Sequence, residues 1–201
     1  VSHYAQYRAK YPQDMCEFLL NKHVINNQSI IADIGSGTGI FAELLLTTGA
    51  TVYGIEPNLA MQQCAESNLS NNANFISVNG TAENTTMPNA SVDAITVATA
   101  FHWFDQQACK KEFKRILKPD GWVMLLWNLR LTELPPLLKD YEGILRKHCP
   151  QYKGIPSQQI AEQELLAFFA ENSVEILEFA NQQQLDKDGL IGRLRSTSYA
   201  L

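Results

Sequence analysis

Apolar runs of strand length alternate with amphipathic segments through the first two thirds of the chain. The runs at 30–34, 51–55, 74–78, 94–99 and 122–127 are short and rich in Val, Ile or aromatic residues, as buried strands are. Strands that alternate with helices are typical of a parallel sheet covered on both faces. The pattern therefore predicts an α/β fold with a Rossmann-like, mostly parallel sheet and helices on both faces.

The segments between these runs have helical periodicity. Residues 40–48 place Phe41, Leu44 and Leu45 on one face, residues 59–69 continue the pattern, and 106–117 follows a capping residue at Asp105. Residues 119–121, with the sequence Pro-Asp-Gly, predict a turn into the fifth strand. A further helix precedes the first strand, because Pro12 suits a first helical turn and apolar residues follow it at helical spacing.

The rhythm changes after the fifth strand. Residues 132–149 and 157–171 both have helical periodicity, and we expect them to form a small helical cap above the sheet. Residues 174–179 alternate like a further strand, and 186–195 return to helix. We interpret residues 1–201 as a single domain with a leading helical segment (1–23), a core (24–130), a cap insertion (131–172) and a return to the core (173–201).

Composition narrows the function classes. The 201 residues carry a net charge of −5, and no run of Lys or Arg exceeds the pair Lys110 and Lys111, which argues against nucleic acid as a partner. The longest apolar stretches are of strand length, which argues against a membrane span. The four cysteines form no CxxC pair and have no clustered His, so we expect reduced thiols, no metal site and a cytoplasmic protein without a signal peptide.

Three glycines at every second position, Gly35, Gly37 and Gly39, directly follow the first strand. A glycine loop between a strand and a helix lets a nucleoside or an anion lie against bare backbone. The dinucleotide fingerprint GxGxxG requires its third glycine at position 40, where this chain has Ile40. The spacing favours a ligand without a pyrophosphate, whose amino acid end lies along the loop close to Asp33.

Glu56 follows the second strand, 21 residues after Gly35. In such folds an acid about 20 residues after the glycine loop binds the ribose hydroxyls. Each charge-assisted hydrogen bond from a ribose hydroxyl to the carboxylate contributes roughly 1.5 to 3 kcal/mol. The alternative, glycines that serve only a tight turn and an acid that serves only solvent, does not account for the loop, the acid and their interval together.

The stretches DIGSGTG (33–39) and IEPN (55–58) resemble the class I S-adenosylmethionine-dependent methyltransferases, in particular the small-molecule group that includes trans-aconitate methyltransferase. The similarity extends over about residues 4–128. It implies that Asp33, Gly35 and Gly37 line the methionine portion, and that Glu56 holds the ribose. The full set of cofactor-binding residues that we expect is Tyr7, Arg8, Asp33, Gly35, Ser36, Gly37, Glu56, Pro57, Met61, Thr81, Ala82, Glu83 and Thr99.

The resemblance also assigns the outer parts of the site. Met61 would cover the adenine, Ala82 and Glu83 would border its amino group, and the leading stretch YAQYRAKYP (4–12) would close over the cofactor. For Arg8 an acidic acceptor, the cofactor carboxylate and plain solvent all stay open. Methyltransferases of this class end with an antiparallel strand beside the fifth, and we expect that strand to be missing from these 201 residues.

His102 and Trp103 follow the fourth strand, at the edge where ligands bind in open α/β sheets. A histidine there can act as the base that takes a proton from an acceptor hydroxyl, or it can simply pack and hydrogen-bond. Aromatic rings attract a cation, and five aromatic residues are candidates to surround a sulfonium. They are Tyr4, Tyr7, Tyr11, Trp103 and Trp127. Core packing explains Trp127 equally well.

The sequence TAFHWF (99–104) stands where many amino-methylating relatives of this superfamily carry an Asn/Asp-Pro-Pro-aromatic motif. Base and amide methylation are thereby disfavoured, whereas oxygen, carboxylate, carbon and small-amine acceptors stay open. We expect an enzyme that transfers a methyl group from S-adenosylmethionine to a small molecule by in-line displacement. An NAD-dependent oxidoreductase and a non-catalytic binding module with the same pocket are the alternatives.

Overall fold

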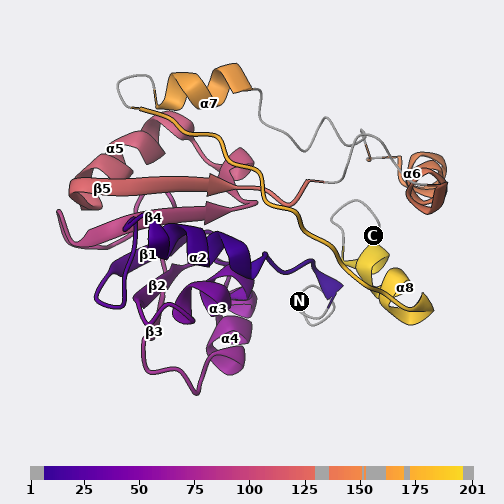
Figure 1. Ribbon diagram of the computed structural model, residues 1–201, viewed down its shortest axis with the longest axis horizontal. Helices are drawn as coiled ribbons and strands as arrows, with labels where there is room; N and C mark the ends of the chain where they lie inside the picture. Colours follow the sequence, from indigo (N-terminus) through magenta and orange to yellow (C-terminus); the bar gives the residue numbers. More distant parts are fainter. Residues whose placement is uncertain (1–6, 130–135, 151, 153–161, 170–172, 197–201) are drawn as a thin grey trace.

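The computed structural model describes residues 7–129, 136–150, 152, 162–169 and 173–196. Five parallel strands form one sheet in the order β3-β2-β1-β4-β5 (Figure 1). Their bounds are β1 (Ile30–Ile34), β2 (Thr51–Ile55), β3 (Phe75–Val78), β4 (Val92–Ala98) and β5 (Leu117–Leu126). The predicted parallel sheet is confirmed, and the first two strands have the predicted bounds.

Helices follow the strands as predicted. The core helices are α2 (Gln13–Asn21), α3 (Ile40–Leu46), α4 (Leu59–Asn68) and α5 (Gln106–Ile116), with a short 3-10 helix, η1 (Phe101–Trp103), before α5. The carboxylate of Asp105 caps α5 by accepting hydrogen bonds from the backbone of Gln107 and Ala108. Pro12 is the N-cap of α2 and therefore lies one residue before the first turn in which we expected it.

The two faces of the sheet carry separate apolar clusters because side chains alternate along each strand. Ile31 of β1 belongs to a buried cluster with residues of α2 and α3, such as Leu45. Ala32, the next residue, belongs to the cluster that contains Phe113 and Ile116 of α5. Helices therefore cover both faces of the sheet, as predicted.

The strand order places the switch point of the sheet at the carboxyl end of β1. The chain leaves β1 toward β2 on one side, and β4 pairs with β1 on the other side. At such a point the loops diverge and leave a crevice, which is where ligands bind in open α/β sheets. The glycine loop and the segment after β4 both lie at this point.

The Pro-Asp-Gly stretch at 119–121 does not form a separate turn before the fifth strand, because it lies inside β5. The register with β4 steps from Val92↔Leu117 to Ala94↔Trp122, so these residues bulge out of the ladder. Asp120 has a φ of 63°, in the left-handed region that a bulge admits. The predicted turn is wrong because residues on both sides of this stretch pair with β4, so the stretch belongs to one strand.

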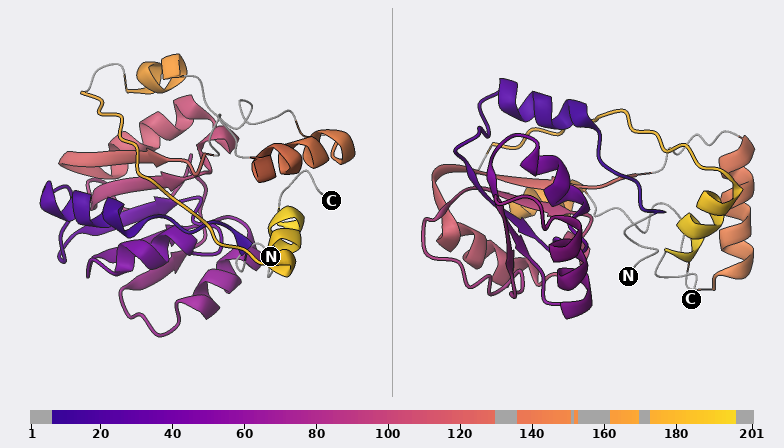
Figure 2. Two further views of the ribbon diagram at one scale, coloured as in Figure 1. Left: turned by 45° about the vertical axis from the view of Figure 1, so that its right-hand side comes forward. Right: turned by 90° about the horizontal axis from the view of Figure 1, so that it is seen from below.

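The two helices after β5 join different apolar clusters. These are α6 (Pro136–His148) and α7 (Glu162–Phe168). Phe168 of α7 packs edge-on against Phe101, with 4.8 Å between ring centroids, so α7 lies beside α5 (Figure 1). Leu145 of α6 instead clusters with Leu194 of α8 (Lys187–Arg195), and both views in Figure 2 show α6 beside α8. Predicted helical residues 132–135, 157–161 and 170–171 lie outside the described residues.

The predicted strand at 174–179 is wrong. Residues 173–186 run as an extended segment that forms no ladder with the described strands, and 63% of Ile176 is exposed. Phe179 packs on Phe18 of α2, with 5.8 Å between ring centroids. Alternating apolar residues favour a strand only where a neighbouring strand supplies backbone partners, and the described part of the chain supplies none here. Within the described residues the sheet has five strands.

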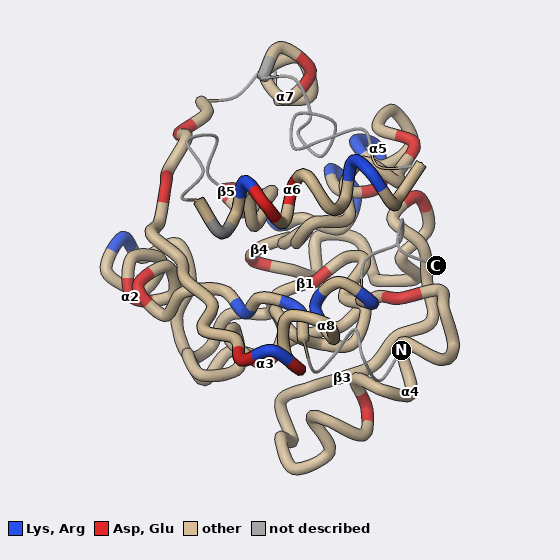
Figure 3. Tube along the Cα trace, turned by 90° about the vertical axis from the view of Figure 1, so that its right-hand side faces the viewer, with Lys and Arg blue, Asp and Glu red and all other residues tan. Residues whose placement is uncertain are grey.

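Residues 187–195 form a helix as expected, with Asp186 as its N-cap. Among the described residues, no helix has the length and apolar character needed to cross a membrane. Figure 3 shows acidic and basic residues mixed along the helices that face the viewer. In Figures 1 and 3, α6 and α8 lie beyond the carboxyl ends of the strands, on the same side as the switch point.

Candidate cofactor site

Asp33 lies at the floor of the switch point, fully buried in β1. Its Oδ1 accepts a hydrogen bond of 2.7 Å from the hydroxyl of Thr96 on β4, whereas its Oδ2 is buried without a hydrogen-bond partner among the described residues. Burial raises the pKa of Asp33 to about 7, against the hydrogen bond from Thr96, and the charge of Glu56 adds to the rise. A buried acceptor left unpaired is costly, which suits an oxygen that receives a ligand's donor.

All three loop glycines have positive φ, between 57° and 82°, so each suits a residue without a Cβ. Two of them are also required by protein packing. A Cβ on Gly35 would lie 2.7 Å from Cβ of Ala100, and one on Gly39 would lie 2.9 Å from Cδ1 of Leu69. A Cβ on Gly37 would meet only Sδ of Met61, at 4.0 Å. The open space over the loop is therefore at Gly37.

The amides of the glycine loop are hydrogen-bonded inside the protein. The N–H groups of Gly35 and Ser36 both donate to the carbonyl of Ile55, at 2.9 and 3.2 Å. The N–H of Gly37 donates to Oε2 of Glu56 at 2.9 Å, and that of Gly39 donates to the carbonyl of Ser36. With these amides in use the loop lacks the cradle of free N–H groups that holds a pyrophosphate, which agrees with the unusual glycine spacing.

Glu56 is anchored at the end of β2 with both oxygens defined. Oε2 accepts from Gly37, and Oε1 accepts from the backbone N–H of Asn58 at 2.9 Å. Each carboxylate oxygen has two lone pairs, so this arrangement fixes the group and leaves acceptor capacity for hydroxyls. Asn58 then caps α4 by accepting from Met61, which brings the Met61 side chain over Gly37. Pro57, between these two anchors, is exposed.

The predicted site residues in the segment after β3 differ in exposure: Ala82 is buried, Glu83 is half-buried and Thr81 is exposed. Thr81 and Asn84 bond each other's backbone, and Ala82 is buried in the cluster that contains Phe113. Oε1 of Glu83 accepts from the backbone of Asp105. Burial raises the pKa of Glu83, but the hydrogen bonds from Asp105, Thr81 and Cys109 outweigh it, and the pKa lies below its ordinary value. The segment is thereby fastened to the start of α5.

The described part of the leading stretch reaches the same edge of the sheet. The hydroxyl of Tyr11 lies 3.0 Å from Oγ1 of Thr99, the residue after β4, and Thr99 has a φ of 57°. Tyr7 packs against Gly192 of α8, and Arg8 donates a hydrogen bond to the carbonyl of Ser196. The structure thus brings Tyr11 to the switch point, whereas Tyr7 and Arg8 contact the C-terminal segment. Tyr4 lies outside the described residues.

His102 and Trp103 lie in η1, at the carboxyl end of β4. Both are exposed, Trp103 by 75%, and their ring centroids are 4.9 Å apart. Neighbouring chain still desolvates the imidazole enough to lower the pKa of His102, so the ring is neutral near pH 7. Trp127 packs against the α5 cluster, as the packing alternative expected.

Sequence reasoning missed Thr96, the partner of Asp33. The register pairs Asp33 with Thr96 across β1 and β4, and Thr96 is fully buried in a strand that is otherwise mostly apolar. A lone hydroxyl in such a run is the signal that points to it. Among the described residues, no group of three or more His, Cys, Asp or Glu side chains is placed to hold a metal ion.

Residues 32–125 match the family described as a methyltransferase domain. A methyltransferase-like protein of Schizosaccharomyces pombe is 29% identical over 76% of this chain and 59% of its own length. An uncharacterized methyltransferase of Mycobacterium bovis is 32% identical over 65% of this chain and 51% of its own. The solved S-adenosylmethionine-dependent methyltransferase of Aquifex aeolicus superposes with a TM-score of 0.57 at 17% identity, over 81% of this chain and 88% of that one, and shares the fold.

The core of the chain is therefore similar to the class of S-adenosylmethionine-dependent methyltransferases. S-adenosylmethionine is the cofactor of that class, and three features of the switch point fit it: the anchored carboxylate of Glu56, the unpaired buried oxygen of Asp33, and the open space at Gly37. The chain spans about half to three fifths of the length of these two relatives.

Proposed function

We propose that the protein transfers a methyl group from S-adenosylmethionine to a small-molecule acceptor by in-line displacement. The observation that carries the proposal is the way Glu56 is held, between the Gly37 and Asn58 amides and beside the open space at Gly37. Bound S-adenosylmethionine supplies an electrophilic methyl carbon on a sulfonium. Glu56 would accept the ribose hydroxyls, and Asp33 would accept from the ammonium of the methionine portion.

Other residues complete this proposed cofactor site. Met61 lies over Gly37 and would cover the adenine, while Ala82 and Glu83 would border its amino group. Gly35, Ser36 and Pro57 shape the loop around Glu56, and Thr81 shapes the turn before Ala82. Tyr11, Thr99 and the leading residues Tyr7 and Arg8 would close the methionine side. The protein's contribution is to align donor and acceptor and to exclude water, which can contribute roughly 7 to 11 kcal/mol in well-oriented systems.

His102 is the base that we propose for an acceptor hydroxyl, with Trp103 beside it as a wall of the acceptor site. The ring is accessible, stands at the carboxyl end of β4 and is neutral near pH 7, as a base must be. The chain lacks the Asn/Asp-Pro-Pro-aromatic motif at this point, which favours oxygen, carboxylate, carbon or small-amine acceptors. We propose that the acceptor is a polar small molecule of the kind that trans-aconitate methyltransferase accepts.

Calorimetry with S-adenosylhomocysteine tests the cofactor part. We expect saturable binding to the wild-type protein and at least a tenfold weaker affinity for Glu56→Gln, because the neutral amide loses the charge-assisted hydrogen bonds to the ribose. Glu66→Gln on the exposed face of α4 is the matched control, expected to bind like wild type. Absence of binding to folded wild-type protein contradicts the proposal. A screen of metabolite pools for S-adenosylhomocysteine release then identifies the acceptor.

A further inference from the structure

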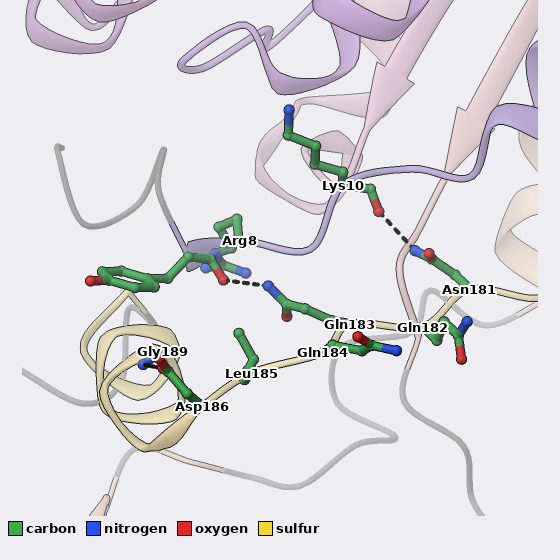
Figure 4. Close-up of a pocket in the computed structure, with 10 residues that line it drawn as sticks. Arg8, Lys10, Asn181, Gln182, Gln183, Gln184, Leu185, Asp186 and Gly189 are labelled. Atoms are coloured by element: carbon green, nitrogen blue, oxygen red, sulfur yellow. Dashed lines mark hydrogen bonds between the residues drawn. The ribbon is translucent and has the colours of Figure 1, made fainter.

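The leading segment, residues 7–12, is held by side-chain amides that bind its backbone. Nδ2 of Asn181 donates to the carbonyl of Lys10 at 2.8 Å, and Nε2 of Gln183 donates to the carbonyl of Tyr7 at 3.0 Å (Figure 4). Nδ2 of Asn128, just after β5, donates to the carbonyl of Ala9 at 3.3 Å. Asn181 and Asn128 are also bonded to each other, at 2.8 Å. We call Asn128, Asn181 and Gln183 the amide clamp.

The extended backbone of residues 173–186 explains why these amides face the leading segment. In an extended chain successive side chains point to opposite sides. Asn181 and Gln183 point toward residues 7–10, whereas Gln182 and Gln184 point away from them (Figure 4). A hollow of about 780 Å³ lies between the two segments.

The clamp sets the position of Tyr11, the residue after Lys10. The Tyr11 hydroxyl bonds Thr99 at the end of β4, and its ring packs on Phe41 of α3, with 4.9 Å between centroids. Lys10 itself forms an ion pair with Glu43 of α3. Thus the amide clamp, through its hydrogen bonds to the carbonyls of residues 7, 9 and 10, holds the leading segment beside the carboxyl end of β4.

We propose that Asn128, Asn181 and Gln183 are positioning residues, which fasten the leading segment over the cofactor site through its peptide carbonyls and so couple cofactor retention to the C-terminal segment. The inference rests on the proposed function. Because the clamp binds carbonyls, it does not depend on which side chains residues 7–10 carry. Asn181 contributes most, since both of its hydrogen bonds are 2.8 Å long, whereas the donor bonds of Asn128 are 3.3 and 3.4 Å.

Calorimetry with S-adenosylhomocysteine measures the coupling. We expect Asn181→Ala to bind it about fivefold to twentyfold more weakly than wild type, the loss expected from two hydrogen bonds. Asn128→Ala should lose less, and the double variant should be little weaker than Asn181→Ala, because the two side chains share a bond. Gln182→Ala, whose side chain points away, is the matched control and should bind within twofold of wild type.

Trypsin gives a second readout, because Arg8 and Lys10 are cleavage sites inside the held segment. Cleavage after these residues should be several-fold faster in Asn181→Ala and in Gln183→Ala than in Gln182→Ala, with no change in Tm or in cleavage elsewhere. General destabilisation would instead raise cleavage throughout, and that outcome overturns the proposal. So does wild-type affinity in Asn181→Ala, with or without faster cleavage. If wild type itself binds no S-adenosylhomocysteine, the proposed function fails and, with it, the coupling.

Discussion

The hydroxyl of Thr96 donates a 2.7 Å hydrogen bond to one oxygen of Asp33, and the second oxygen of that carboxyl is buried without a partner among the described residues. Burial raises the pKa of Asp33 from its ordinary value of 3.8 to about 7. The folded protein therefore holds a proton on Asp33 at pH values where the unfolded chain has lost it. Folding stability contributed by this group must fall as the pH rises from about 4 to about 7, and then level off.

Asp33→Asn isolates this effect. The amide is neutral at every pH, so the variant should gain stability relative to wild type between pH 5 and pH 8, by up to about 3 kcal/mol. Urea denaturation at the two pH values measures it. A stability difference between variant and wild type that is the same at both pH values would show that Asp33 is already ionised in the folded protein at pH 5.

The loop glycines have different tasks, and alanine scanning separates them. Gly39→Ala should lower the Tm, because its Cβ would press against Leu69 and Ala65 of the neighbouring helix region in addition to the cost of positive φ. Gly37→Ala meets no such contact and should lose only about 1 to 2 kcal/mol from its backbone conformation.

The order of the two variants is reversed for binding affinity: Gly37→Ala is expected to be the more stable of the two but the weaker binder. Gly37→Ala should lose most affinity for S-adenosylhomocysteine, since its methyl group fills the open space over the loop. Its loss of affinity should exceed that of any Gly39→Ala protein that remains folded. Calorimetry and a thermal melt on each variant check both expectations, and equal affinity of Gly37→Ala and wild type would place the ligand elsewhere.

Glu112 of α5 holds the segment after β3 in place. Its carboxylate accepts hydrogen bonds from Arg115 and from both the backbone and the hydroxyl of Thr85. The hydrogen bond from Arg115, and then those from Thr85, lower the pKa of Glu112 to about 2, against the effect of burial. This stabilisation should be present above about pH 4.5 and lost as the pH falls toward 2.

Glu112→Ala should therefore destabilise the protein by about 2 to 3 kcal/mol at pH 7, because the backbone and hydroxyl of Thr85 lose a buried acceptor. The loss should shrink in acid. Chemical denaturation at pH 7 and pH 3.5 measures both values. Lys111→Ala, on the exposed face of the same helix, serves as control, and a Glu112→Ala protein as stable as this control would contradict the expectation.

His102 is testable once an acceptor has been found. If it is the base, His102→Gln should lower kcat by roughly 10² to 10⁴ with an acceptor hydroxyl and leave the affinity for S-adenosylhomocysteine unchanged. Because desolvation by the neighbouring chain lowers the pKa of His102, the wild-type rate should rise with pH in the acid range and reach its plateau at a lower pH than an ordinary histidine would give. A pH profile of kcat checks this, and an unaltered rate in the variant assigns the ring to packing.

Much of the core follows from local sequence. Apart from Asp33 and Gly54, the buried positions of the strands at 30–34 and 51–55 carry apolar side chains, and the helices between strands carry their apolar residues on one face. These patterns depend on neighbours a few residues apart, so a single chain reveals them. The glycine loop and Glu56 could also be predicted from the sequence, because their spacing along the chain reflects the geometry of one strand-helix-strand unit.

Residues 173–186 show which features local sequence patterns do not predict. Residues 174–179 alternate as a strand does, yet a strand exists only where another chain segment offers its backbone, and no local pattern reports that. The stretch at 119–121 looks like a turn, and only the register with β4 makes it a bulge. The contacts of Tyr7 and Arg8 with α8 likewise join residues more than 180 positions apart.

The class of fold, the strand-loop-helix unit and the acid that anchors it could all be predicted from the amino-acid sequence, because each is encoded by residues close together along the chain. Tertiary structure alone decided that Thr96 meets Asp33, that Gly37 is the open position of the loop, and that Asn181 holds the carbonyl of Lys10. These are through-space relations. They depend on how the strands order and how the chain returns across them, which local propensities leave unspecified.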